Sequence, residues 1–266
     1  MENKNLQREL SIGEILTQTF NLYSRNFAHY PVPFLVAGIL TGLVTIAVRL
    51  VIVIPEVPIN PTSQLLLAWF PTFLTATVTS LFLSGIVSWI ANSFTTGITT
   101  KFTSDLLENE QANLQTSFAF TLTKVLPLLA ASIITSMLIV LGLIAVIVPG
   151  IILALMFSLV YPVIMLEGTG VLESLSRSRV LVSNRWLKTF GLLLLLAIIV
   201  YAINGVFVFV AFVLFSGPLG VVGPLISSIL TALITPIFAI AITLYYYSMK
   251  ARTAPPLPPP PPAQTF

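Results

Sequence analysis

"LIAVIVPGIILALMFSLVYPVIMLEG", residues 143–168, decides the fold because it carries no charge until Glu167. The uncharged run begins further back, at Val125, and is 42 residues long. A helix of about 20 residues crosses a bilayer core of roughly 30 Å, so this run is long enough for two crossings. Pro149 and Gly150 lie inside it. Because proline interrupts the helical hydrogen-bond ladder and glycine favours tight turns, the pair predicts the turn of a helical hairpin.

The composition of the whole chain is that of an integral membrane protein. Its 266 residues are 56% hydrophobic and 8% charged, with a mean hydropathy of +1.01, whereas soluble domains carry about 25% charged residues. The chain has no cysteine, which excludes disulfides, thiolate metal ligands and cysteine nucleophiles. The net charge of +3 is small, and we expect no nucleic-acid partner.

Six apolar runs predict six transmembrane helices in an all-α fold, arranged as three hairpins. The expected spans are about 31–54, 66–100, 125–148, 150–166, 189–215 and 219–249. A second cluster of helix breakers, Ser216-Gly217-Pro218, marks the turn between the last two spans. We expect residues 1–250 to form a single membrane domain and residues 251–266 to form a disordered, proline-rich tail.

The distribution of Lys and Arg predicts the orientation in the membrane. Of the 12 Lys and Arg residues, 11 lie in segments 1–30, 101–124 and 167–188 or in the C-terminal residues 250–266. The positive-inside rule therefore predicts a multi-pass protein of the cell membrane with both termini in the cytoplasm. An even number of spans is consistent with this orientation.

An amphipathic interfacial helix is expected before each hairpin. Ser11 and Glu14 have the spacing of a capping box, which predicts a surface helix over 11–28. Residues 170–188 repeat its pattern of apolar and polar faces, and residues 104–124 form a weaker third copy. Two explanations remain open: a threefold repeat, or surface helices that arise in any membrane protein with long inner loops.

Two predicted spans carry stripes of small polar residues at i+4 spacing, which share one helix face. The second span contains Ala76, Ser80, Ser84, Ser88, Asn92, Thr96 and Thr100, and the sixth contains Ser227, Thr231, Thr235, Ala239 and Thr243. The stripes are expected to face each other. We favour close helix packing as their role over a hydrophilic path for a solute, because no ionisable residue joins them.

Three further residues inside the spans have expected structural roles. Asn204 is expected to make a hydrogen bond to another helix. Pro162 and Pro236 are expected to kink their helices.

The strongest charge feature is a basic cluster made of Arg177, Arg179, Arg185 and Lys188. Four cations near the inner leaflet can attract anionic lipid head groups, at about 1 kcal/mol each. The alternative is that these residues only set the topology. The inner loops and the proline-rich tail are candidate docking sites for a protein partner.

Residues suited to catalysis are scarce. His29 is the only histidine, and no second carboxylate accompanies Glu167. Acid–base and metal-assisted chemistry need several convergent groups, and no phosphate-binding loop or nucleophile elbow is present. We expect neither catalytic residues nor a metal or cofactor site, and the chain is not expected to be an enzyme.

Several stretches resemble the six-span membrane domain attached to some glycerophosphoryl diester phosphodiesterases, and its free-standing prokaryotic relatives. The shared elements are Pro149-Gly150, the segment from Pro162 to Glu167, and Leu175-Ser176-Arg177-Ser178, within a resemblance that covers residues 10–250. The phosphodiesterase catalytic half is absent from the chain. The resemblance therefore implies the membrane module alone, with a role in a lipid-related process and no activity of its own.

Two functional hypotheses follow. The first is a non-enzymatic membrane module that recruits lipids or a partner through its basic inner surface, and the second is a small permease or channel that uses the polar stripe. Glu167 is assigned a structural role, in which its carboxylate complements the dipole of the following helix and pairs with Arg177 or Arg179.

Overall fold

The structure is a computed structural model that describes residues 8–59, 62–214 and 222–253. These residues form helices and no strand, and six stretches are long and apolar enough to cross a membrane. The expectation of an all-α protein with six candidate spans is confirmed. The helices are α1 (Ile12–Arg25), α2 (Pro31–Val51), α3 (Ser63–Asn109), α4 (Leu114–Ala145), α5 (Ile147–Met156), α6 (Val160–Glu167), α7 (Val171–Val182), α8 (Trp186–Leu214), α9 (Gly223–Ala232) and α10 (Thr235–Thr253).

The capping box at the start of α1 forms as predicted. Ser11 Oγ accepts a hydrogen bond from the backbone N–H of Glu14 at 3.3 Å, and Glu14 Oε2 accepts one from the N–H of Ser11 at 2.7 Å. These contacts satisfy two backbone donors that a helix start leaves free. The helix ends at Arg25, three residues before the predicted boundary.

The separate surface helix predicted over 104–124 does not exist. α3 continues to Asn109, where Glu110 adopts a left-handed conformation with φ of 58°, and α4 begins at Leu114. Asn113 caps α4 through Oδ1, which accepts from the N–H of Gln115 at 2.7 Å. No residue then breaks the helix before the apolar run, so the predicted amphipathic segment is divided between the ends of two long helices.

The predicted turn at Pro149-Gly150 is also wrong in position. α4 ends at Ala145, Val146 has extended backbone angles (φ −161°, ψ 142°), and α5 begins at Ile147. Pro149 therefore lies in the first turn of α5, where a proline removes no helical hydrogen bond. Gly150 is needed for packing, because a Cβ there would lie 2.4 Å from Leu143 Cγ in α4.

Two of the candidate spans are interrupted in the middle. The fourth, Ile147–Glu167, is divided into α5 and α6, and the sixth is divided into α9 and α10. Pro162 cannot donate to the carbonyl of Ser158, and Pro236 cannot donate to that of Ala232, because each proline lacks an N–H. At each expected kink the α-helix is interrupted by a turn of two or three residues with i→i+3 hydrogen bonds, so the single helix predicted over 150–166 is two.

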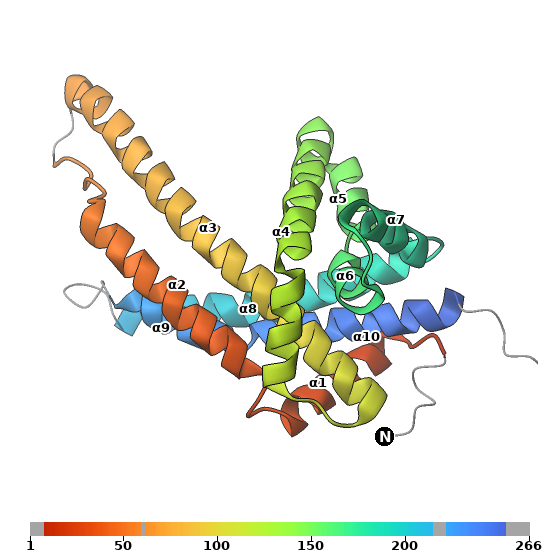
Figure 1. Ribbon diagram of the computed structural model, residues 1–266. Coiled ribbons are helices and arrows are strands. Elements are labelled where there is room, and N and C mark those ends of the chain that lie inside the picture. The colour runs from red at the N-terminus through yellow and green to blue at the C-terminus, as the bar shows by residue number, and fades with distance from the viewer. Residues whose placement is uncertain (1–7, 60–61, 215–221, 254–266) are drawn as a thin grey trace, which may run out of the picture.

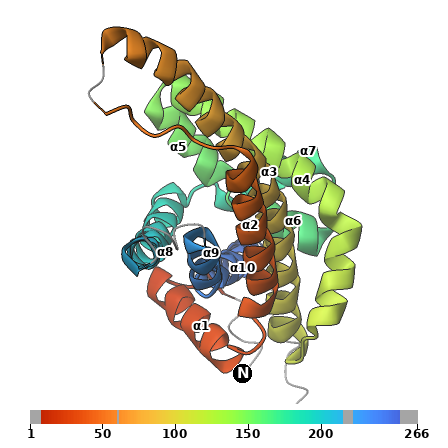
Figure 2. The same ribbon diagram turned by 90° about the vertical axis from the view of Figure 1, so that its left-hand side faces the viewer.

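α10 is the central helix of the protein. It packs against α1, α2, α3, α6, α7, α8 and α9, and it lies between α1 and α8 on one side and α3 and α6 on the other (Figure 2). α2 and α3 run side by side away from this centre, as do α4 and α5 (Figure 1). The main hydrophobic core is built on α10, with Ile240, Leu244 and Met249 fully buried.

The predicted tail and the predicted turn before the sixth span are described only in part or not at all. α10 continues to Thr253, so residues 251–253, which were predicted to belong to the tail, are helical. The rest of the predicted tail, 254–266, and the predicted turn Ser216-Gly217-Pro218 lie outside the described residues.

Candidate functional site

Three consecutive tyrosines on α10 bond to three different helices. Tyr245 Oη shares a hydrogen bond of 2.6 Å with Thr189 Oγ1 of α8, and Tyr246 Oη donates to Glu167 Oε1 of α6 at 2.9 Å. Tyr247 Oη shares a hydrogen bond of 2.7 Å with Ser104 Oγ of α3. Successive residues of a helix point about 100° apart, so one short stretch reaches partners on several sides. We call Tyr245, Tyr246, Tyr247 and these partners the tyrosine layer.

Glu167 has hydrogen-bond partners on two other helices. Besides the bond from Tyr246, it accepts a hydrogen bond at Oε2 from Arg177 Nε, at 2.9 Å. The expected pairing with Arg177 is confirmed. The carboxylate thus joins α6, α7 and α10 in one contact.

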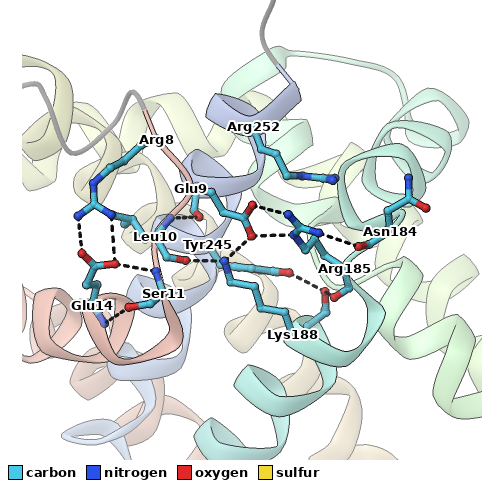
Figure 3. Close-up of polar contacts among 12 residues, drawn as sticks. Arg8, Glu9, Leu10, Ser11, Glu14, Asn184, Arg185, Lys188, Tyr245 and Arg252 are labelled. Atoms are coloured by element: carbon cyan, nitrogen blue, oxygen red, sulfur yellow. Dashed lines mark hydrogen bonds and ion pairs between the residues drawn. The ribbon is translucent and has the colours of Figure 1, made fainter.

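The basic cluster is largely engaged inside the protein. Arg185 Nε and Nη2 donate to the carboxylate of Glu9 at 2.8 and 3.0 Å, and Lys188 Nζ donates to Glu9 Oε1 at 2.6 Å (Figure 3). Arg177 pairs with Glu167, as described above. Arg179 is exposed and has no ion pair within the described residues. No local sequence pattern indicates Glu9, because its partners lie 176 and 179 positions further along the chain.

Glu9 belongs to a short N-terminal segment, residues 8–11, that we call the strap. The side chain of Leu10 is buried, its N–H donates to Ser248 Oγ of α10 at 2.8 Å, and its carbonyl accepts from Lys188. Hydrogen bonds from Arg185 are the main cause that lowers the pKa of the Glu9 carboxyl to about 2. The strap therefore fastens the beginning of the chain to α8 and α10.

Side chains from other helices satisfy the backbone at both breaks. Ser178 Oγ of α7 donates to the carbonyl of Met156 at 2.6 Å and accepts from the N–H of Leu159 at 3.2 Å. At the second break, Tyr23 Oη of α1 donates to the carbonyl of Leu233. A buried backbone group without a hydrogen-bond partner is costly, and these two hydroxyls provide partners.

The two polar stripes face each other, as expected, and Thr243 Oγ1 lies 3.4 Å from Thr100 Oγ1. The two stripes are not in contact along their whole length. Between α3, α6, α8, α9 and α10 they leave a cavity of about 400 Å³, which we call the polar pocket. Its polar lining consists of Asn92, Thr96 and Thr100 of α3, Tyr161 of α6, Tyr201 and Asn204 of α8, Thr231 of α9, Thr235 of α10, and Ser158 between α5 and α6.

The predicted stripe residues differ in their relation to this pocket. Asn92 lines both the polar pocket and a smaller cavity of about 260 Å³ between α2, α3 and α9, and Ser88 lines the smaller cavity alone. Ser84 Oγ donates to the carbonyl of Ser80 in its own helix, at 2.6 Å. Neither Ser80 nor Ser84 lines either cavity.

Asn204 does not make the predicted hydrogen bond to another helix. Its Nδ2 donates to the carbonyl of Val200 in α8 at 2.9 Å, and its Oδ1 is buried with no partner among the described residues. Sequence reasoning missed this, because the conformation of the amide decides which of its atoms is free. Asn204 therefore contributes to the lining of the polar pocket, while its Oδ1 is enclosed by protein atoms.

Both helix breaks adjoin the polar pocket. Tyr161 and Pro162 line it just after the first break, and Thr235 lines it just after the second. Discontinuous helices that meet around a cavity at membrane depth are the usual setting of substrate sites in membrane transporters. The repeated placement of a proline within three residues of each new helix start, at Pro162 and Pro236, was the available sequence signal.

Comparison with known proteins finds one family. A family model described as "Domain of unknown function (DUF7847)" matches residues 10–249. No curated protein and no solved structure matches the chain.

Proposed function

The chain belongs to the family described as a domain of unknown function (DUF7847), and we propose that it is a non-enzymatic membrane protein that binds an uncharged molecule in the polar pocket. The observation that carries this proposal is the pocket itself. Two polar stripes that could have packed against each other leave a cavity of about 400 Å³, with the exposed amide of Asn92 in its lining. Small-molecule sites have volumes of roughly 300 to 1,000 Å³.

The exposure of Asn92 supports a ligand. Asn92 lines the polar pocket and is exposed, so its amide can both donate a hydrogen bond to a ligand and accept one from it. Packing alone, the role we favoured from the sequence, accounts for Ser84 and Thr243, whose hydroxyls bond within their own helices. It does not account for a cavity of about 400 Å³ beside an exposed amide.

The chemistry of the lining supports binding over catalysis. The described residues of the polar pocket carry amides, hydroxyls and apolar groups, with no carboxylate, imidazole or amine. General acid–base catalysis relies on groups with a pKa close to the working pH. The lining also holds no charge that would compensate a bound ion, which favours an uncharged ligand.

We propose that both termini lie in the cytoplasm and that the apolar helices form three hairpins in the cell membrane. The positions of Lys and Arg support this orientation, which places the tyrosine layer between the polar pocket and the cytoplasm. Because the chain lacks cysteine, single cysteines provide a test. Glu56→Cys is expected to react with an impermeant maleimide on intact cells, and Arg179→Cys only after permeabilisation. Labelling of both on intact cells would contradict the orientation.

The basic cluster supports a narrower lipid role than the sequence suggested. Arg177, Arg185 and Lys188 already pair with Glu167 and Glu9, so their charges are partly neutralised. Arg179 is the member that we propose for contact with anionic head groups. The resemblance to the phosphodiesterase membrane domain stays a prediction, and it agrees with a lipid-related ligand.

A permease that uses the same pocket is the second candidate function. The two interrupted spans beside the polar pocket favour it, since this arrangement is typical of secondary transporters. In a permease the tyrosine layer would have to open, whereas in a binding protein it would stay closed.

One experiment separates binding from transport. The protein is purified in a mild detergent, and co-purifying small molecules are quantified by mass spectrometry for the native chain, Asn92→Leu and the control Ser84→Ala. We expect a species that Asn92→Leu loses and Ser84→Ala keeps. Proteoliposomes are then tested for flux of glycerol, urea and the retained species. Flux that Asn92→Leu abolishes would favour the permease, and the absence of any pocket-dependent species would contradict the binding proposal.

A further inference from the structure

The smaller cavity and the polar pocket meet at Asn92. Asn92 lines both cavities, and so do Thr231 of α9 and Thr235 of α10. These two threonines lie on either side of the break between α9 and α10. Because the two cavities share these wall residues, they are adjacent, and the break in the sixth span lies where they meet. We call the two cavities together the double cavity.

The free polar groups of the α3 stripe are gathered in the double cavity. Ser88, Asn92 and Thr96 line it, and their side chains make no hydrogen bond within the described residues. Ser84 lines neither cavity, and its hydroxyl bonds to its own helix at 2.6 Å. Ser88 and Asn92 are exposed, and Thr96 is half-buried. A molecule in the double cavity can therefore reach all three side chains.

These groups lie at a depth where lipid chains cannot satisfy them. Asn92 belongs to the candidate span Ser63–Asn109 and lies within residues 66–100, which carry no charged side chain. It precedes Thr100 by about 12 Å along the helix axis. An amide or a hydroxyl that is surrounded by hydrocarbon without a hydrogen-bond partner is costly. The double cavity therefore favours water or a polar molecule over a lipid chain.

The spacing of the three side chains indicates the shape of a ligand. Residues four apart share a helix face and differ by about 6 Å along the axis, so Ser88, Asn92 and Thr96 form a row about 12 Å long. A molecule with a single polar group satisfies only one of them. A molecule with hydroxyls along its length satisfies all three, because a hydroxyl both donates and accepts hydrogen bonds. The described lining of both cavities has no charged side chain, which favours an uncharged molecule.

We infer that the double cavity is one continuous site for an uncharged polyhydroxylated molecule that lies along α3. Asn92 contacts the middle of this molecule, and Ser88 and Thr96 contact its two ends. Linear polyols and disaccharides have this chemistry. The inference rests on the proposed function and deepens it, because it names the class of ligand and extends the site into the smaller cavity.

The first test compares three variants by mass spectrometry of the small molecules that co-purify in a mild detergent. Ser88→Leu changes the smaller cavity alone, Thr96→Leu changes the polar pocket alone, and Asn92→Leu changes both. We expect each variant to retain at least fivefold less of the co-purifying species than the native chain, and the control Ser84→Ala to retain as much. Tandem mass spectrometry should identify an uncharged species with at least three hydroxyl groups. Circular dichroism and gel filtration verify the fold of each protein.

A second test uses a thiol reagent as the probe. Because the chain lacks cysteine, single cysteines report whether the double cavity is hydrated. In phosphatidylcholine nanodiscs, Ser88→Cys and Thr96→Cys should react with 2-hydroxyethyl methanethiosulfonate at least tenfold faster than Leu81→Cys, since the reactive thiolate requires a polar environment. Leu81 is 69% exposed and lines neither cavity. These variants keep side chains of similar size and serve if a leucine variant does not fold.

The outcomes separate the inference from the proposed function. A species that Thr96→Leu loses and Ser88→Leu keeps would confine the ligand to the polar pocket, so the proposed function would stand and the continuous site would be wrong. A retained species that is charged, or that has fewer hydroxyl groups, would overturn the class of ligand. Reaction of Ser88→Cys and Thr96→Cys as slow as that of Leu81→Cys would overturn the polar site. The absence of any species that depends on Asn92 would contradict both proposals.

Discussion

Tyr246 Oη donates a hydrogen bond of 2.9 Å to Glu167 Oε1 and so connects the central helix to the end of an interrupted span. Arg177 binds the same carboxylate from α7. A carboxylate in this position is stable only while its partners are present, because a buried charge without partners is costly. The contact explains why the long uncharged run ends on an acid.

Removal of the Tyr246 hydroxyl tests this contact. Tyr246→Phe should lower the free energy of unfolding by about 1.5–3 kcal/mol, the range for hydrogen bonds to charged groups. Thermal unfolding in a mild detergent measures the change. Tyr201→Phe is the matched control, because the Tyr201 side chain is exposed and makes no hydrogen bond within the described residues. Equal stability of the two variants would show that the contact contributes nothing.

The Glu9 contacts predict that the stability of the folded protein decreases at acidic pH. The pKa of Glu9 is lowered from 4.5 to about 2 in the folded protein, so its stabilising effect is present above pH 4.5 and is lost as the pH falls towards 2. Glu9→Gln should be less stable than the native chain at pH 7 and should lose less stability between pH 4.5 and 2. Unfolding of both proteins measured from pH 7 to pH 2 tests both points.

A control for Glu9 is available on α7. Glu173 is exposed and has no ion pair within the described residues, so Glu173→Gln should follow the native curve. Parallel acid curves for the native chain and Glu9→Gln would contradict the role of the strap contact.

The contact between α4 and α5 predicts different effects at two adjacent residues. Gly150→Ala should destabilise the protein by about 1–3 kcal/mol, as overpacking does, because the added Cβ meets Leu143. Pro149→Ala should have a smaller effect, since Pro149 lies in the first turn of α5. Gly205→Ala is the control, as a Cβ there meets no atom within 4 Å. Thermal unfolding of the three variants would contradict this account if Pro149→Ala were the most harmful.

Removal of the Ser178 hydroxyl tests how much its hydrogen bonds stabilise the interruption between α5 and α6. Ser178→Ala removes the donor to Met156 and the acceptor for Leu159, and each buried group left without a partner costs about 1–3 kcal/mol. Ser176→Ala is the control, because Ser176 is exposed on the same helix. Hydrogen exchange should show faster exchange over residues 157–161 in Ser178→Ala alone. Unchanged exchange there would mean that the break needs no such support.

Much of the fold was predictable because it follows from local physics. Uncharged runs of sufficient length gave the six candidate spans, and the spacing of Ser11 and Glu14 gave the start of α1. The turn at Val146 was not predictable from residue type, since valine favours extended backbone without requiring a turn. Pro149 was a misleading signal, because a proline is tolerated in the first turn of a helix as well as in a turn between helices.

The candidate site was predictable only in part. The i+4 spacing revealed which faces of α3 and of the sixth span are polar, and so predicted that the stripes meet. Whether they pack flush or enclose a cavity depends on how Pro162 and Pro236 break the neighbouring helices. Which atom of the Asn204 amide lacks a partner depends on the conformation of the side chain, and the spacing of residues in the sequence does not determine that conformation. Long-range ion pairs such as Glu9 with Arg185 have no local pattern at all.

A structure of the purified protein in lipid nanodiscs tests the central claim most directly. At a resolution that shows bound molecules, we predict non-protein density in the polar pocket, within hydrogen-bonding distance of the Asn92 amide, about 3 Å. A pocket that has collapsed, or that holds no such density, would contradict the account.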